Sequence, residues 1–196
     1  MTARSEAPVA PAAARRGGTP GETDRNPEGL GLFALLREDL RTHGGSPFEQ
    51  GFWALAVHRY GNRRMRVRPR ILRLPFSLLY WTLFRFVEWT CGISLLYTVR
   101  VGRRVRIWHH GGIILNAESI GDDVQIRQNT TLGLRRRGGE GQLPVIEARV
   151  DVGCGACILG PVRVGHDSAI GANAVVLCDV PPHALAVGVP ARVIRR

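Results

Sequence analysis

An aliphatic residue returns at every sixth position towards the C-terminus of the chain. The members of this series are Ile146, Val152, Ile158, Val164, Ile170 and Val176. A period of six fits neither an α-helix, which repeats every 3.6 residues, nor a free strand, which alternates every two. It fits a coil of three short strands, because after three units the chain returns above its starting point. The pattern therefore predicts a parallel β-helix with three stacked pairs, Ile146 under Val164, Val152 under Ile170, and Ile158 under Val176.

The same spacing occurs upstream, with a slip of one residue on the way. Its members are Val101, Ile107, Ile113, Ile120, Ile126 and Leu132. Together the two series predict roughly four coils over about residues 99–181, with the aliphatic positions buried. The spacing breaks between Leu132 and Ile146, so residues 134–144 are expected to leave the coil as a loop. A strand-like extension is expected after Pro182.

A helical pattern precedes the repeats. Leucines 32, 35, 36 and 40 share one face, and residues 37–39 (Arg-Glu-Asp) are expected on the outer side. A second helix is predicted over Phe48–Tyr60, with Ser46 as its cap and Pro47 in its first turn. Residues 1–28 are rich in Ala, Pro, Gly and Arg without periodicity, which predicts a disordered tail.

A basic stretch and an apolar run separate these helices from the repeats. Seven arginines lie between Arg59 and Arg73, and the apolar run Leu74–Tyr97 follows. The run is long enough to span a membrane, but Arg85 and Glu88 in its middle each cost about 2.5–3.5 kcal/mol. We therefore expect a helix from about Pro75 to Thr90 that covers the open end of the β-helix. A basic amphipathic segment at a membrane surface is the alternative.

Three segments of the repeat resemble the hexapeptide-repeat acyltransferases. They are VGCGACILGPVRVG at 152–165, IGANAVVL at 170–177 and VGVPARVI at 187–194. Within that class the chain is most similar to the serine acetyltransferase group. The resemblance implies a left-handed parallel β-helix that binds acetyl-CoA between neighbouring coils and assembles as a homotrimer, or as a hexamer through residues 30–90.

The helical region carries the same resemblance. Residues 37–39 match an R-E-D stretch of the group, and residues 51–59 match its G-F-x-A-L-x-x-H-R stretch. The resemblance thus covers about residues 30–196. We expect a mainly β protein with a tail at 1–28, a helical segment at 29–92 and an acyltransferase β-helix at 93–196.

The candidate catalytic base lies in the segment 107–113, which reads IWHHGGI. In the family a histidine stands two residues after the aliphatic position of a unit, and the repeat phase assigns that place to His109. An imidazole suits a general base because its ordinary pKa of about 6.5 lets it accept a proton near neutrality. His110 stands where the family usually has glycine, and it is the candidate if the register is shifted by one.

Two positions depart from the serine acetyltransferase pattern. The acidic residue that supports the catalytic histidine is replaced by Ser94, and a hydroxyl orients an imidazole without stabilising its charge. The Arg-His pair expected to bind the amino-acid substrate is replaced by Gln142 and Leu143. An O-acetyltransferase acting on a sugar, polysaccharide or other hydroxylated acceptor therefore remains open.

The resemblance also suggests residues that contact acetyl-CoA. Gly133 matches the glycine of a T-L-G stretch whose amide faces the thioester and supplies an oxyanion donor. Small residues that leave space for the pantetheine arm are Gly155, Ala156 and Ala172. Candidates for a CoA phosphate or an anionic substrate are Arg192 near the C-terminus and Arg135 and Arg136 on the loop.

Charge and cysteine content narrow the remaining choices. The 196 residues include 27 Lys and Arg against 16 Asp and Glu, a net charge of +11. No nucleic-acid-binding motif accompanies this charge, and CoA is itself a polyphosphate, so no nucleic-acid partner is expected. The four cysteines fit free thiols in a reducing cytoplasm, and the single C-x-x-C at 154–157 lacks the second pair of a metal site.

Taken together, these features predict a cytoplasmic, acetyl-CoA-dependent serine O-acetyltransferase that forms O-acetylserine for cysteine biosynthesis. A minor alternative is a β-helix scaffold that only oligomerises. The sequence contains no G-x-S-x-G elbow and no P-loop, which excludes serine hydrolases of that type and P-loop nucleotide hydrolases.

Overall fold

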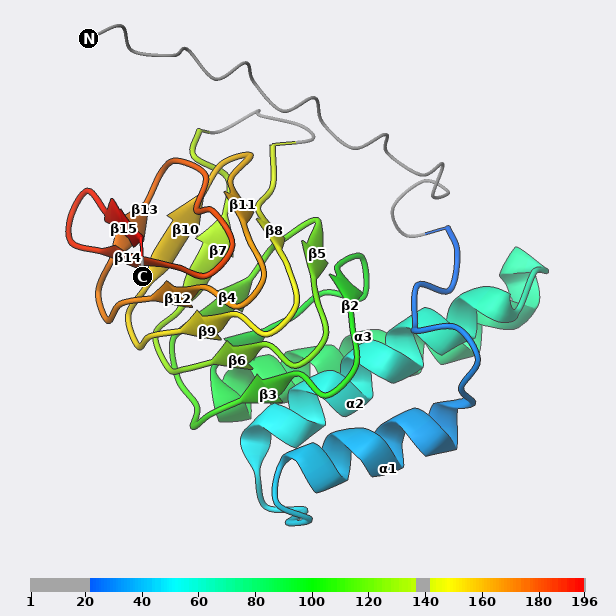
Figure 1. Ribbon diagram of the computed structural model, residues 1–196. Helices are drawn as coiled ribbons and strands as arrows, with labels where there is room; N and C mark the ends of the chain where they lie inside the picture. The colour runs from blue at the N-terminus through cyan, green and yellow to red at the C-terminus, as the bar shows by residue number, and fades with distance from the viewer. Residues whose placement is uncertain (1–21, 137–141, 196) are drawn as a thin grey trace, which may run out of the picture.

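The computed structural model describes residues 22–136 and 142–195. Three helices, α1 (Leu32–Thr42), α2 (Gln50–Arg63) and α3 (Arg70–Cys91), precede a stack of short strands, and a 3-10 turn (Arg64–Arg66) joins α2 to α3 (Figure 1). Within the described residues, no helix is long and apolar enough to cross a bilayer.

The strands form three sheets that are the three faces of a parallel β-helix (Figure 1). Sheet A has the order β1 (Ile93–Ser94), β4 (Ile113–Leu115), β7 (Thr131–Gly133), β10 (Cys157–Leu159) and β13 (Val175–Val176). Sheet B has the order β2 (Arg100–Val101), β5 (Ser119–Ile120), β8 (Val145–Ile146) and β11 (Arg163–Val164). Sheet C has the order β3 (Arg106–Ile107), β6 (Gln125–Ile126), β9 (Asp151–Val152), β12 (Ala169–Ile170), β14 (Ala184–Val187) and β15 (Arg192–Arg195).

The register confirms the stacking that the six-residue period predicts. Strand pairing sets Ile146 beside Val164, Val152 beside Ile170, and Ile158 beside Val176 in the expected parallel arrangement. These six side chains are at most 3% exposed, so they form the aliphatic interior of the stack. The strands make four coils, and β1 pairs with β4 below the first of them.

The two irregular segments lie where the spacing breaks. The chain leaves sheet A after Gly133 and re-enters sheet B at Val145, and residues 137–141 of the expected loop lie outside the described part. The C-terminal extension is β14, which pairs in parallel with β12, and β15, which turns back antiparallel to β14. A reversed strand ends the stack because it presents no further parallel edge for another coil.

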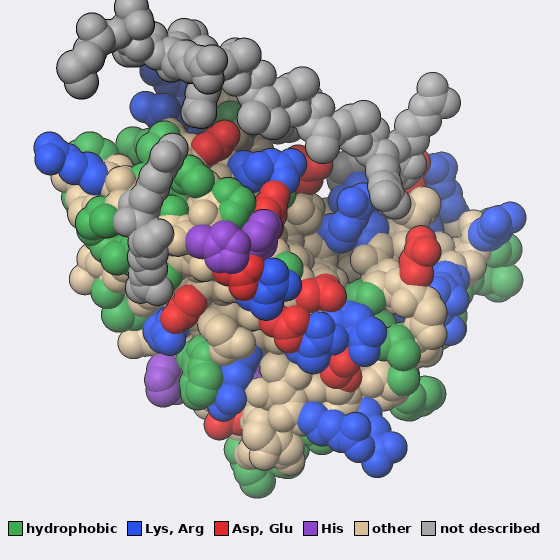
Figure 2. Space-filling model, in the orientation of Figure 1, with side chains coloured by type: hydrophobic (Ala, Val, Ile, Leu, Met, Phe, Trp, Pro, Cys, Tyr) green, Lys and Arg blue, Asp and Glu red, His purple; other side chains and the backbone are tan. Residues whose placement is uncertain are grey.

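The corner between sheets B and C is a column of charged residues in the left-handed conformation. The column contains Arg104, Asp123, Arg149, Asp167 and His183, with φ between 54° and 60°. Arg104 pairs with Asp123 and Arg149 with Asp167, both at 2.6 Å, so opposite charges alternate from coil to coil. Acidic and basic side chains also lie interleaved on the face shown in Figure 2. A turn conformation that is unfavourable for arginine is therefore accompanied by a ladder of two ion pairs.

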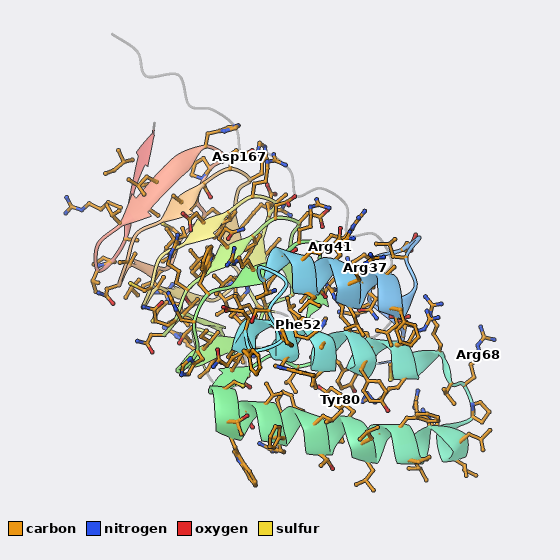
Figure 3. All side chains as sticks on the ribbon, turned by 90° about the horizontal axis from the view of Figure 1, so that it is seen from below. Arg37, Arg41, Phe52, Arg68, Tyr80 and Asp167 are labelled. Carbon is orange, nitrogen blue, oxygen red and sulfur yellow. The ribbon has the colours of Figure 1, made fainter. Side chains whose placement is uncertain are left out.

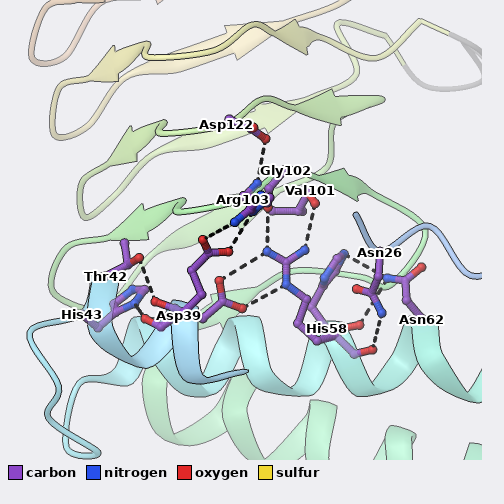
Figure 4. Close-up of polar contacts among 12 residues, drawn as sticks. Asn26, Asp39, Thr42, His43, His58, Asn62, Val101, Gly102, Arg103 and Asp122 are labelled. Atoms are coloured by element: carbon purple, nitrogen blue, oxygen red, sulfur yellow. Dashed lines mark hydrogen bonds and ion pairs between the residues drawn. The ribbon is translucent and has the colours of Figure 1, made fainter. Parts of the chain in front are cut away.

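Side chains of the helices form hydrogen bonds with the free backbone groups at the lower edge of the stack. Strand β2 ends sheet B, and Arg59 of α2 donates to the carbonyls of Val101 (2.8 Å) and Gly102 (2.6 Å) there. His58 Nε2 lies 2.9 Å from the Val99 carbonyl, and the Ile107 amide donates to His43 Nε2 at 3.2 Å. Figure 4 shows the contacts at Val101, Gly102 and Asp39. Side chains from the helices thus replace the strand that would otherwise pair with this edge.

The expected outward position of residues 37–39 is wrong for two of the three. Asp39 is fully buried, and its carboxylate lies 3.0 Å from Nε of the buried Arg59. Glu38 accepts from Arg103 at 2.8 Å, and Arg37 alone is exposed. A buried guanidinium needs a counter-charge, which is why the acidic residue turns inwards; removing one partner of such a pair typically costs about 3–5 kcal/mol.

Several expected helix boundaries also differ. Helix α2 begins at Gln50 and has no side-chain cap, because the Ser46 hydroxyl instead accepts from the Phe48 amide in the preceding loop. Helix α3 begins at Arg70, so Pro75 lies inside the helix rather than at its start. The N–H that Pro75 lacks would bond the carbonyl of Ile71, and that residue is solvent-exposed, so water can replace the bond.

The end of the predicted tail is ordered. Residues 1–21 lie outside the described part, whereas residues 22–28 pack against the helices and the first coil. The Arg25 amide donates to Asn62 Oδ1 at 3.0 Å, and Asn26 Nδ2 donates to the Arg59 carbonyl at 2.9 Å. The expected boundary at residue 28 is therefore too late, because these hydrogen bonds fix the chain earlier.

Acid should destabilise the fold through His58. Complete burial lowers the pKa of His58 from 6.5 to about 3, so the unfolded chain binds more protons between these values and stability falls as the pH falls. Between pH 7 and pH 5 this single group should lower the free energy of unfolding by about 2 kcal/mol. His58→Gln has no titratable ring at this position. Between pH 7 and pH 5 its free energy of unfolding, measured by urea titration, should therefore fall by about 2 kcal/mol less than that of the wild type. An equal loss in both proteins would show that another group controls acid unfolding.

Candidate active site

The candidate base lies on the turn that joins β3 to β4. His109 has a φ of 61°, and Gly111 and Gly112 follow with φ of 91° and 65°. The Gly111 amide donates to the Cys91 carbonyl and the Ile113 amide to the Gly92 carbonyl, both at 3.0 Å. The turn is therefore anchored to the C-terminal end of α3 and cannot shift independently of it.

Both imidazoles of this turn are exposed. Neither His109 nor His110 makes a side-chain hydrogen bond to any other residue that the structure describes. An exposed, unpaired imidazole remains accessible to an acceptor hydroxyl, as a general base must be. The geometry does not by itself distinguish His109 from His110, so the assignment rests on the repeat phase.

Trp108 is a neighbour to which the sequence pattern assigned no role. Its indole Nε1 donates to Gln125 Oε1 at 2.8 Å, and the Arg106 guanidinium carbon lies 3.4 Å from the centre of its ring. The Trp108 and His109 rings are 6.5 Å apart, centre to centre. The Trp108 ring therefore lies in a fixed position beside the candidate base. A large aromatic residue directly before the histidine was the sequence feature that could have indicated this contact.

Ser94 lies near this turn without bonding to it. It is half-buried on β1, in register with Ile114 on β4, the strand that follows the histidine turn. Among the residues that the structure describes, the Ser94 hydroxyl makes no hydrogen bond to the imidazole of His109 or His110. The fold thus brings Ser94 close to the candidate base but gives His109 no orienting contact from it.

The candidate cofactor residues of the later coils lie at the same corner as His109. This corner, between sheets C and A, is a second left-handed column, formed by His109, Asn129, Gly155 and Asn173. The Gly155 amide donates to the Gln128 carbonyl at 2.9 Å, and the Asn173 amide donates to the Cys154 carbonyl at 2.8 Å. A side chain on Gly155 would meet Asn173 Oδ1, so this glycine is also required for coil stacking.

The remaining small residues and Arg192 differ in what they present. Ala172 is exposed on the next turn of this corner, whereas Ala156 is buried and its methyl group faces the interior. Arg192 is exposed at the start of β15, directly after a turn held over β13 by the Ala191 amide, which donates to the Val175 carbonyl at 2.8 Å. His109, Gly155, Ala172 and Arg192 therefore follow one edge of the prism.

A second group of expected residues lies where the strands of sheet A end, whereas His109 precedes these strands. Gly133 ends β7, and its carbonyl accepts from the Gly160 amide at 2.9 Å, so its backbone belongs to the ladder between β7 and β10. No described atom lies within 4 Å of the place a side chain would take. Gly133 itself is buried, and the role of its amide toward a thioester stays a prediction. Arg135, Arg136 and Gln142 are exposed beside it.

One cluster elsewhere has the composition of a metal site. Ligand atoms of His166, Asp167 and His183 lie within 4.8 Å of one another. Both carboxylate oxygens of Asp167 are already taken by Arg149 at 2.6 Å, and this contact holds the pKa of Asp167 well below its usual range. The cluster is the upper end of the ion-pair ladder, on the corner away from His109.

The fold and the histidine turn define a class of protein. A left-handed parallel β-helix with hexapeptide repeats is the architecture of the hexapeptide-repeat acyltransferases. No protein-family model matches the sequence. Individual proteins do match it, and all of those described below are serine acetyltransferases.

Two curated relatives and two solved structures illustrate the similarity. The Helicobacter pylori serine acetyltransferase is 37% identical over 132 residues, 67% of this chain and 77% of the relative. The Mycobacterium tuberculosis enzyme is 42% identical over 110 residues, 56% of this chain and 48% of the relative. Soybean serine acetyltransferase complexed with serine superposes with a TM-score of 0.69 and 28% identity. The match covers 83% of this chain and 69% of the soybean chain. A serine acetyltransferase complex with CoA superposes with a TM-score of 0.66 and 27% identity. This match covers 83% of this chain and 69% of that one.

The chain belongs to the serine acetyltransferase family. It spans about half the length of several curated relatives, including the Mycobacterium tuberculosis and Escherichia coli proteins.

Proposed function

We propose that this chain is a serine O-acetyltransferase that transfers the acetyl group of acetyl-CoA to the serine hydroxyl. The observation that carries the proposal is the exposed His109 on its anchored turn, at the corner that also bears Gly155, Ala172 and Arg192. Membership of the family supports both substrates, because similar structures are complexes with serine and with CoA. A glycan acceptor has no such support, and neither has a purely structural role.

The proposed reaction is direct transfer. His109 accepts the proton of the serine hydroxyl while that oxygen attacks the thioester carbonyl, and the resulting imidazolium returns the proton to the departing CoA sulfur. Holding both substrates in one cleft makes a covalent acyl-enzyme unnecessary. The product, O-acetylserine, is a substrate for cysteine formation.

Replacing His109 should test the assignment of the base. Loss of a general base typically costs 10²–10⁴-fold, so His109→Ala should lower kcat by about that factor while CoA still binds. His110→Ala is the matched control, since it removes the adjacent exposed imidazole, and it should lower kcat less than tenfold. The measurements are CoA thiol release and O-acetylserine formation. A reversed order of effects would assign the base to His110, and no effect of either variant would refute histidine catalysis.

Ser94 leaves the base without an acidic partner. A carboxylate in this place would stabilise the imidazolium, which the hydroxyl does not. We expect Ser94→Asp to raise kcat, and Ser94→Asn, which has the same size and no charge, to leave it unchanged. If both variants behave alike, charge at residue 94 has no bearing on His109.

The complete site is proposed to use more than one copy of the chain. His109 precedes the strands of sheet A, and Gly133, Arg135 and Arg136 follow them, so the two groups lie on different corners of the prism. A neighbouring copy that brings its Gly133 end to the His109 corner would complete the cleft. We therefore propose a homotrimer, the assembly that the family resemblance implies, in which one head-to-tail contact repeats around a closed ring.

Mass measurement in solution should therefore give three times the chain mass, or six times if the helical regions pair. Mixing His109→Ala chains with chains altered at Arg135 and Arg136 should restore part of the activity that each lacks alone. A fully active monomer would refute the shared site.

A further inference from the structure

The two sides of α3 differ in what they contact. Its inner residues Tyr80, Phe84 and Val87 are buried against α2 and the first coil. The outer side carries large apolar residues that are exposed, namely Ile71, Leu72, Leu74, Phe76, Leu78, Leu79, Trp81, Phe86 and Trp89. Ile71, Leu78 and Trp89 are 80%, 72% and 82% exposed. The covering role expected for this segment thus uses only its inner side.

The outer side of α3 is long and unobstructed. The helix has 22 residues, which gives it a length of about 33 Å. It lies at the edge of the molecule with α2 between it and α1, and its outer side chains point away from the other elements (Figure 3). An exposed apolar strip of this size is uncommon on a surface that meets only water.

The chain around this strip is rich in arginine. Residues 50–91 contain eight arginines and a single acidic residue, Glu88; Arg59 is buried against Asp39, and Arg63 and Arg66 lie beside Asp24. Glu88 accepts from Arg85 at 2.7 Å, so it is already paired. Arg68, Arg70 and Arg73, at the N-terminal end of α3, form no ion pair with any carboxylate of the described residues. Arg68 projects from this end of the helix in Figure 3.

A groove extends the apolar strip towards α2. It has a volume of about 300 Å³ and is lined by Trp53, Ala56, Val57, Leu83, Phe86, Val87, Thr90 and Cys91. Trp53 and Phe86 are exposed at its rim, so the groove is continuous with the outer side of α3. Apolar surface from both helices is therefore available to a single partner.

We propose that the outer side of α3 docks on an anionic lipid bilayer, with the helix lying in the plane of the surface. Hydrocarbon covers the apolar strip, tryptophans lie at the headgroup level, and Arg68, Arg70 and Arg73 contact anionic headgroups. A second copy of the chain fits this surface less well, because it brings the same arginines and its only nearby carboxylate is already paired. No helix of the described chain can span the bilayer, so the contact is peripheral.

Docking in this way has a consequence for the histidine turn. Gly111 is hydrogen-bonded to Cys91 at the C-terminal end of α3, so the turn moves with the docked helix. The candidate site is then held at a fixed height next to the membrane. This inference does not depend on the identity of the acceptor.

The test is co-sedimentation of the full chain with vesicles. Wild-type protein should bind phosphatidylcholine vesicles that contain about 30 mol% phosphatidylserine, which gives a strongly anionic surface. It should bind pure phosphatidylcholine vesicles at least tenfold more weakly. Arg68→Gln/Arg70→Gln should lower the partition constant on anionic vesicles roughly 25-fold, about fivefold for each arginine. Binding should also fall as salt is raised.

Matched variants on α1 serve as controls. Arg37→Gln/Arg41→Gln removes the same charge from exposed positions on the far side of α2, and should change binding less than about twofold at physiological salt. For the apolar contact, Leu78→Glu/Trp89→Glu should reduce binding at least tenfold. Phe33→Glu, at a residue 86% exposed on α1, should not. Circular dichroism and thermal unfolding establish that each variant is folded.

Three results would overturn the proposal. The first is absence of wild-type binding to anionic vesicles. The second is equal binding by the α3 variants and their α1 controls. The third is a change in oligomeric mass, measured by light scattering, in Leu78→Glu/Trp89→Glu without any loss of vesicle binding, which would assign the strip to contacts between copies.

Discussion

The stacking of coil upon coil is the constraint on which the rest of the structure depends. Each short strand pairs with the strand one coil above and one below, so the inward side chain at every sixth position must fit between aliphatic neighbours. Three faces also require three corners in each coil, and at two of these corners the chain turns through a residue with positive φ. One column of such residues carries alternating charges, and the other carries His109. The candidate base is therefore held by the same geometry that builds the core.

A stack of this kind must end somewhere, and its lower end explains the helical segment. The last strands of sheets B and C expose carbonyl and amide groups that no further coil can satisfy. His43, His58 and Arg59 reach these groups from the helices, and Asp39 neutralises the arginine. Polar side chains buried for this purpose make the helices and the first coil one structural unit. The histidine turn is in turn anchored to the end of α3.

The β-helix and its helical cover place the candidate site residues on two corners of the prism. They also leave α3 with one buried side and one exposed side. His109 and Gly133 lie on different corners of the prism, on either side of sheet A. Helix α3 closes the core with one side and leaves a basic, apolar strip on the other. A helix needed only as a cover would be expected to carry polar residues on its outer side.

The six-residue repeat was enough to predict the β-helix, its stacked pairs and the loop, because such a repeat is a direct record of strand spacing; it also predicted the place of His109 in the repeat. It also indicated three helices, although their ends depended on caps and loop contacts that a local pattern does not reveal. The burial of Asp39 could not be predicted from the local pattern, because its partner Arg59 is twenty residues away and its burial depends on the edge of a distant sheet. The same holds for Trp108 beside His109 and for the separation of Gly133 from it. These relations join segments through space, and periodicity along the chain carries no information about them.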